Sequence, residues 1–192
     1  MTTTGATART PASVPGRPTP EAFRGFMSAY FTGVAVVTSV DAEGRPHGLT
    51  CNSLTSVTLD PPTLLVCLGE HSGTLGAVRD RAGFLVNLLH EGGRGAAELF
   101  ASRAADRFDR VGWRENRSGG LPWLVDDAYA MAECTVADVK IVGDHAVVFG
   151  EVVAVQTTRG NPLLYGRHTF SNRTLRDTGA AGHPLIEERT GS

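Results

Sequence analysis

The chain has 192 residues, a formal net charge of −2 and a hydrophobic fraction of 41%. This length favours one domain with a substantial core, and the near-neutral charge argues against binding to nucleic acid. No apolar run approaches the ~20 residues of a membrane span, and the N-terminal residues lack the apolar core of a secretory signal. We therefore expect a globular cytoplasmic protein that has no contact with a membrane.

The cysteines argue against a disulfide framework and against a zinc site. Cys51, Cys67 and Cys134 are odd in number, widely spaced and outside any CxxC pair. Each lies in an apolar, strand-like segment, so we expect small buried core residues.

The N-terminal part predicts a tail followed by a helix. Residues 1–20 are rich in Thr, Ala, Pro, Gly and Arg and have little to bury, which is typical of a disordered tail. A helix is expected over 19–33, with Thr19 as its cap, Pro20 in its first turn and Gly33 at its end. Its apolar side chains recur at helical spacing and should pack onto the domain. They are Phe23, Phe26, Met27, Tyr30 and Phe31.

Strand patterns dominate the rest of the chain. A hairpin is expected over 34–41 and 45–54, with its turn at Glu43-Gly44. The other expected elements are strands at 63–69 and 84–89, helices at 74–83 and 92–113 (helical at least to Phe108), long strands within 129–157 with a turn at Gly143-Asp144, and a last strand at 162–170. Tight turns favour a mainly antiparallel sheet, and helical crossovers are too few for a doubly wound one. A closed or split β-barrel with peripheral helices fits best, followed by a polar segment that ends as a loose tail or an exchanged arm.

The stretch "GLTCNSLTSVTLDPP" (48–62) is a candidate binding site. Strand alternation places Thr50 and Asn52 on one face, with Cys51 and Ser53 on the other. Beyond Ser53 the chain must bend, which frees backbone groups beside hydroxyl and amide side chains. Such a neutral polar cradle suits a flat heteroaromatic ligand, or the stretch is a hydroxyl-rich strand edge that bonds its own turns.

Further candidates have two interpretations each. Ser72 and Thr74 stand where a helix begins, so they either cap it or line an anion site. Asn87 is an amide in an apolar strand and needs a partner, either backbone or ligand. His145 follows a turn and could pair with Asp144. Tyr165 is a core, interface or pocket aromatic, and the histidines lack metal-ligand spacing.

Several motifs in order resemble one family. They are "FRGFMSAYFTGVAVVTSVDAEGRPHGLTCNSLTSVTLDPPTLLVCL", "GFLVNLL", "ELFASRAADRF", "AECTVADVKIVGDHAVVFGEVVAV" and "PLLYGRHTF". Together they resemble the flavin reductases that supply two-component monooxygenases, which have the FMN-binding split-barrel fold. The resemblance spans roughly residues 21–170. It implies an antiparallel split-barrel domain over 21–173, tails at 1–20 and 174–192, and a homodimer.

The resemblance also implies cofactors and residue roles. FAD or FMN would be reduced by NADH, or alternatively by NADPH, and His145 would lie over the flavin face where the nicotinamide binds. Glu70-His71 stands where many relatives have a basic residue, so Arg79 or Arg107 is expected to meet the flavin phosphate. The residues expected around the cofactors are Thr50, Cys51, Asn52, Ser53, Ser56, Ser72, Thr74, Asn87, Arg107, Tyr165 and Phe170.

The expected reaction is hydride transfer between two cofactors that the protein aligns. No GxGxxG fingerprint follows a strand, so the nicotinamide nucleotide should not sit on a Rossmann unit. Reduced flavin would then reach a partner monooxygenase by diffusion. The alternatives are a non-catalytic split-barrel flavin carrier and a flavin oxidase of the pyridoxamine-phosphate type.

Overall fold

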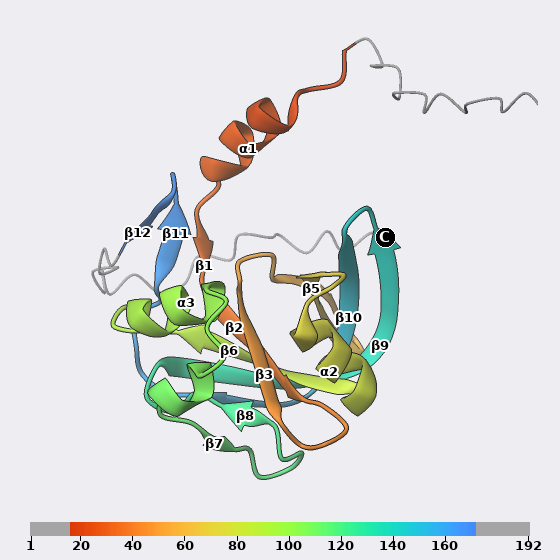
Figure 1. The fold of residues 1–192 in the computed structure, drawn as a ribbon, viewed down its shortest axis with the longest axis vertical. Coiled ribbons are helices and arrows are strands. Elements are labelled where there is room, and N and C mark those ends of the chain that lie inside the picture. The colour runs from red at the N-terminus through yellow and green to blue at the C-terminus, as the bar shows by residue number, and fades with distance from the viewer. Residues whose placement is uncertain (1–15, 172–192) are drawn as a thin grey trace, which may run out of the picture.

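A computed structural model describes residues 16–171, and most of the two expected tails lies outside this range. The main feature is a curved antiparallel sheet of seven strands in the order β3-β2-β6-β9-β10-β5-β4 (Figure 1). A sheet β1-β11-β12 and a ribbon β7-β8 flank it. Because β3 and β4 remain as two free edges of the main sheet, the described strands do not close into a complete barrel. The chain is mainly β with peripheral helices, as predicted.

The described elements follow one another closely. The helices are α1 (Pro20–Ser28), α2 (Gly73–Arg81), α3 (Arg94–Ala101) and the 3-10 helix η1 (Arg107–Arg110). The strands of the main sheet are β2 (Ala35–Val40), β3 (Pro46–Cys51), β4 (Thr55–Leu59), β5 (Pro62–Gly69), β6 (Gly83–Leu89), β9 (Ala128–Val142) and β10 (His145–Thr157). The short strands are β1 (Thr32–Gly33), β7 (Arg114–Glu115), β8 (Pro122–Trp123), β11 (Leu164–Gly166) and β12 (Thr169–Ser171).

The core lies on both faces of β2 and β6. Five of the six β2 residues are buried, because each face of this strand packs against its own apolar cluster. Two of these five are polar and are satisfied by backbone carbonyls. Thr38 Oγ1 donates to Pro122 O at 2.5 Å, and Ser39 Oγ donates to Gly83 O at 2.7 Å. The expected hairpin, β2 with β3, is confirmed.

The helix expected over 92–113 is much shorter in the structure. It ends at Ala101, and Ser102 is extended, with its amide N donating to Leu99 O. A continuous helix would separate Phe100 from Phe108 by about 12 Å along its axis. The break instead brings their ring centroids within 5.0 Å, so aromatic packing outweighs helix continuation.

The last predicted strand, 162–170, is in fact two short strands. β11 and β12 are joined at Arg167-His168, where φ is 50° and 60°. Positive φ at both central residues is the geometry of a tight hairpin turn. Glycine or asparagine usually signals such a turn, and neither stands here, which is why the sequence pattern missed it.

The helix α1 is capped as expected but is packed differently. Thr19 Oγ1 accepts a hydrogen bond from Ala22 N, and Pro20 opens the helix. It ends at Ser28 rather than at Gly33 and stands clear of the sheet (Figure 1). The predicted packing of its apolar face is wrong for Phe26, which is 74% exposed, because α1 joins the small outer sheet through β1 and meets no core surface.

The hydroxyl-rich stretch breaks where expected and then re-enters the sheet. Residues 52–54 leave the ladder after β3, and β4 then pairs with β5 as an edge strand. All five residues of β4 are exposed. The bend is therefore short, and Ser56 lies beyond it on the sheet edge.

Candidate flavin-binding site

A pocket of about 410 Å³ opens where β3 ends, between α3 and the β11–β12 hairpin. The strand β3 supplies Thr50 and the break after it supplies Asn52. The hairpin supplies Tyr165 and Phe170. The remaining lining residues are Val34, Glu98, Ala101 and Ser102. Four of the residues singled out in the sequence therefore meet here.

Apart from Glu98, the polar residues that line this pocket are uncharged. Thr50 Oγ1 donates to Ala97 O at 2.6 Å, which ties β3 to α3. Asn52 is exposed and makes no side-chain hydrogen bond to any of residues 16–171. It also lines neighbouring hollows of about 420 and 170 Å³, so three hollows meet at this amide. Asn52 is free to bond a ligand.

A buried hydroxyl near Asn52 also lacks a partner. Thr32 Oγ1 is shielded from solvent and has no hydrogen-bond partner within the described part of the chain. It lines the 420 Å³ hollow together with Asn52. An orphaned buried hydroxyl is costly unless a ligand or water satisfies it.

The part of the pocket lined by the β11–β12 hairpin is aromatic. The rings of Tyr165 and Phe170 have centroids 5.0 Å apart and are tilted by 59°. A flat ring can stack on such a wall while neutral donors bond its edge. The pocket volume lies within the range of about 300–1,000 Å³ usual for small-molecule sites. The residues present therefore fit the isoalloxazine ring of a flavin.

The predicted phosphate residues lie at the start of α2. Ser72 Oγ accepts from Leu75 N at 3.2 Å, so Ser72 is the N-cap, and Thr74 is buried. A Cβ added to Gly73 would lie 3.1 Å from His47 Nδ1. Glycine at this position therefore lets an imidazole approach the helix N-terminus closely. A phosphate role for Ser72 and Thr74 stays a prediction.

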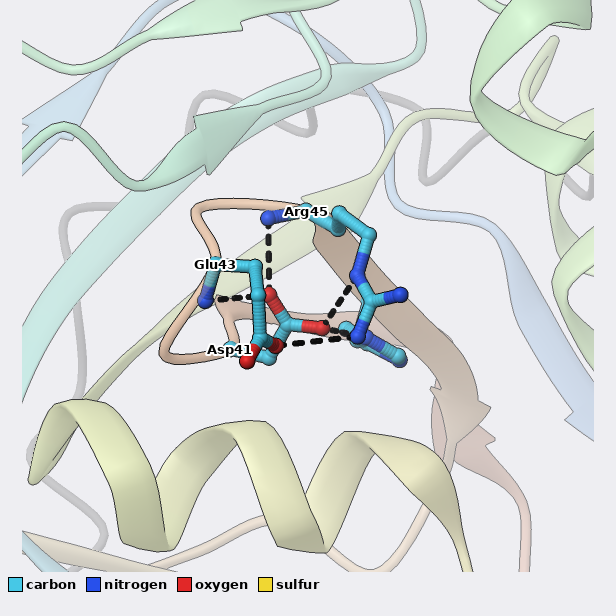
Figure 2. Close-up of polar contacts among 4 residues, drawn as sticks. Asp41, Glu43 and Arg45 are labelled. Carbon is cyan, nitrogen blue, oxygen red and sulfur yellow. Dashed lines mark hydrogen bonds and ion pairs between the residues drawn. The ribbon is translucent and has the colours of Figure 1, made fainter.

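A charged cluster of Asp41, Glu43 and Arg45 lies beside α2 (Figure 2) and contacts that imidazole. The Asp41 carboxylate accepts from His47 Nε2 at 3.0 Å and from the backbone N and Nε of Arg45, both at 2.8 Å. Burial by itself would raise the pKa of Asp41. The hydrogen bonds from His47 and Arg45 outweigh burial and lower this pKa to about 2. Asp41 is therefore a carboxylate at neutral pH and holds His47 in place.

Three predicted residues are engaged inside the domain. Ser53 Oγ accepts from Cys67 N at 2.9 Å and joins β5 to the break after β3. Cys51 faces the core, and burial raises the pKa of its thiol. Asn87 Nδ2 donates to Val36 O at 3.1 Å and to Thr38 Oγ1 at 3.0 Å.

The acceptor of Asn87 is also used, because Oδ1 accepts from Leu124 N at 3.0 Å. The sequence left open whether the partner of the Asn87 amide is the protein or a ligand. In the structure, its hydrogen bonds are made to protein groups. A flavin contact for Ser53, Cys51 or Asn87 stays a prediction.

The remaining predicted residues lie outside the pocket. His145 begins β10, pairs with Gly69 in the ladder, and its Nδ1 lies 2.8 Å from Asp144 Oδ1. That hydrogen bond lowers the pKa of Asp144. Arg107 Nη1 donates to Gly48 O at 2.9 Å, behind α3. His145 and Arg107 do not line the 410 Å³ pocket, and their expected roles stay predictions, as does that of Ser56.

One wall of the pocket was not anticipated. Glu98 and Ala101 share one face of α3, since they are three positions apart, and Ser102 follows directly after the helix end. The sequence signal for this wall was a polar pair, Glu98 and Ser102, four residues apart and beside small residues. The interpretation of 92–113 as one long helix concealed that α3 ends at this point.

Comparison with known proteins identifies the family. The model of the flavin reductase like domain matches residues 27–174. A flavin reductase (NADPH) of Lentzea aerocolonigenes is 55% identical over 148 residues, covering 77% of this chain and 86% of the relative. A flavin reductase (NADH) of Kitasatospora aureofaciens is 40% identical over 159 residues, covering 82% and 83%.

More distant relatives include a monooxygenase component and a complex with ligands. The reductase subunit HsaB of a flavin-dependent monooxygenase from Mycobacterium tuberculosis is 32% identical over 155 residues, covering 79% of this chain and 81% of the relative. The NADH:FAD oxidoreductase SgcE6 of Streptomyces globisporus, solved with NAD and FAD fragments, superimposes with a TM-score of 0.76 at 31% identity, covering 82% and 94%. The predicted split-barrel fold is thereby confirmed. With a matched domain over most of its length and relatives this similar, the chain belongs to the flavin reductase like domain family.

Proposed function

We propose that this chain is an NAD(P)H:flavin oxidoreductase that reduces FAD or FMN and releases the reduced flavin to a partner monooxygenase. The observation that carries the proposal is the unpartnered amide of Asn52, which lines the 410 Å³ pocket together with the aromatic pair Tyr165–Phe170. The relatives named as NADPH- and NADH-dependent flavin reductases support the reaction class.

The chain's own residues would bind and align the two reactants. A flavin would supply the two-electron acceptor and a reduced nicotinamide the hydride. Thr50 and Asn52 would hold the polar edge of the flavin ring, while Tyr165 and Phe170 would cover an aromatic face and exclude water. The Thr50 hydroxyl already donates its proton to Ala97 O, so it would accept from the ring edge. The uncharged Asn52 amide would donate, and such a donor stabilises negative charge that develops on the reduced ring without fixing a full counter-charge.

The partner is inferred from the shape of the site and from a relative. The pocket is open to solvent, so flavin could enter and leave as a substrate. A monooxygenase partner is supported by the likeness to the reductase subunit HsaB. Transfer by free diffusion needs no docking contact between the two proteins.

A homodimer and a cytoplasmic location complete the proposal. Exposed apolar side chains on α1, just after it and on β10 offer a surface for a second copy, notably Phe26, Tyr30 and Val155. The cysteines Cys51, Cys67 and Cys134 are free, in keeping with a reducing compartment. None of the helices in the described range has the length and apolar character that a membrane crossing requires.

Steady-state oxidation of NADH and NADPH, with FMN, FAD and riboflavin added in turn, tests the proposed function. We expect oxidation that depends on added flavin and saturates with it. Binding of flavin without any oxidation of either nucleotide would leave a flavin carrier instead. Oxidation without added flavin, by protein that stays yellow after gel filtration, would point to a tightly bound cofactor and a different reaction.

A further inference from the structure

Two side chains of opposite charge stand on α3 at the edge of the pocket. Arg94 Nε donates to Glu98 Oε1 at 2.8 Å, one helical turn away. Glu98 lines the 410 Å³ pocket, and Arg94 lines an adjoining hollow of about 110 Å³. Phe170 lines both spaces, so the ion pair spans the boundary between them.

The guanidinium of Arg94 is fixed at one nitrogen and free at the other two. The Cζ atom of Arg94 lies 5.5 Å from the centroid of the Phe170 ring. This ring and Glu98 together limit the motion of the guanidinium. Within residues 16–171, Nη1 and Nη2 of Arg94 make no hydrogen bond to the protein. A guanidinium held in this way presents a two-pronged donor suited to a phosphate group.

The same pair carries both charges that distinguish the two nicotinamide dinucleotides. In dinucleotide sites a carboxylate suits the ribose 2′-hydroxyl of NADH, whereas an arginine accommodates the 2′-phosphate of NADPH. We propose that Arg94 binds the adenosine 2′-phosphate of NADPH and that Glu98 disfavours this phosphate, so that the ion pair sets the balance between NADH and NADPH. The inference rests on the proposed function only in taking a nicotinamide dinucleotide to bind beside the flavin, with its adenosine end at the hollow lined by Arg94.

The charges around Arg94 support a role for the ion pair in balancing NADH against NADPH. Glu91, which lines the hollow with Arg94, accepts a hydrogen bond from Asn161 Nδ2 at 3.2 Å and adds a second carboxylate. One arginine thus faces two carboxylates. A dianionic 2′-phosphate would gain from Arg94 and lose from the carboxylates, so small changes in this set shift the preference.

Isothermal titration of the flavin-free full chain with NAD⁺, NADP⁺ and adenosine 2′,5′-bisphosphate tests the pair. Arg94→Gln should raise the Kd for NADP⁺ and for the bisphosphate about tenfold, with a smaller rise for NAD⁺. Glu98→Gln should lower the Kd for NADP⁺ about three- to fivefold relative to that for NAD⁺. The matched control is Arg110→Gln, which removes another exposed i,i+4 ion pair, with Asp106, and should change no Kd.

Two readouts separate this inference from the proposed function. Both side chains of the pair are more than half exposed, so the variants should keep the melting temperature of the parent, and Arg94→Lys should recover part of the lost affinity. Unchanged Kd values in Arg94→Gln and Glu98→Gln would overturn the role of the pair, even if the chain reduces flavin. The expected Kd changes in a chain that oxidises neither nucleotide would uphold the pair and contradict the reductase.

Discussion

At the scale of single residues, the proposed flavin site depends most on Asn52. It is the amide at which three hollows meet, and no described residue bonds its side chain. Asn52→Ala removes one or two hydrogen bonds to the flavin edge, each worth about 1 kcal/mol. We expect the Kd for flavin to rise about five- to thirtyfold in a fluorescence titration.

The control for Asn52 is Thr58→Ala on the exposed strand β4, because Thr58 lines none of the three hollows. This variant should titrate like the parent chain. If Asn52→Ala binds flavin as tightly as the parent does, the amide is not part of the site.

His145 offers a test of the expected nicotinamide role. It is half-exposed and bonded to Asp144. If it meets the nicotinamide, His145→Ala should raise the KM for the reduced nucleotide or lower kcat, while the Kd for flavin stays unchanged. Asp144→Asn serves as the control that keeps the imidazole. An equal loss of flavin binding in His145→Ala would remove the residue from this role.

Asp41 predicts a pH dependence of stability. Its pKa falls from the usual 3.8 to about 2 in the folded chain, where His47 and Arg45 bond the carboxylate. A lowered folded-state pKa contributes stability that is complete above the unfolded pKa and is lost as the pH falls through the folded one. The difference in urea midpoint between the parent and Asp41→Asn should therefore be constant above about pH 4 and shrink toward pH 2. A difference that grows on acidification would contradict this assignment.

Residue contacts could be predicted from sequence only where they are local. Strand alternation alone placed Thr50 and Asn52 on one face, and both line the pocket. The partners of Asn87 could not be foreseen, because Leu124 lies 37 positions away and meets it only in the folded chain. The same holds for Ser53, whose partner Cys67 belongs to another strand.

At the scale of elements, the long strands β9 and β10 pair around a glycine that lies very close to neighbouring side chains. Their ladder shifts at Gly150, where a Cβ would lie 2.5 Å from Phe84 Cζ and 2.9 Å from Cys134 Cβ. Gly150→Ala should lower the free energy of unfolding by about 1–3 kcal/mol, because the core must rearrange to admit the methyl group.

A matched glycine checks that reasoning. Gly76 lies within α2, and a Cβ added there would meet no heavy atom within 4 Å. Gly76→Ala should therefore raise the free energy of unfolding by about 0.5–1 kcal/mol, because alanine loses less backbone entropy in a helix than glycine does. Urea unfolding of both variants supplies the measurement. Equal effects in the two would show that packing at Gly150 is not limiting.

Elements with long, regular patterns were predictable, and those ended by tertiary contacts were not. The turn at Gly143-Asp144 and the flanking strands match the structure, because alternation and a glycine turn are local signals. The end of α3 is set by Phe108 returning to pack on Phe100 and on Trp113. No local feature of the sequence marks that reversal.

At the scale of the whole molecule, α1 predicts an association between two copies. Phe26 is 74% exposed, so replacing it should cost the folded monomer little. In sedimentation equilibrium, Phe26→Ser should weaken the proposed dimer, whereas Glu21→Ser on the same helix should not. A parent chain that is monomeric at all concentrations would contradict the proposed dimer.

The most direct test of the central claim is a crystal structure of the chain with oxidised flavin and NAD⁺. The account predicts the flavin ring in the pocket beside β3, with Asn52 bonded to its polar edge and an aromatic of the β11–β12 hairpin over one face. Flavin bound at a different surface, or Asn52 without any contact to the ring, would contradict it.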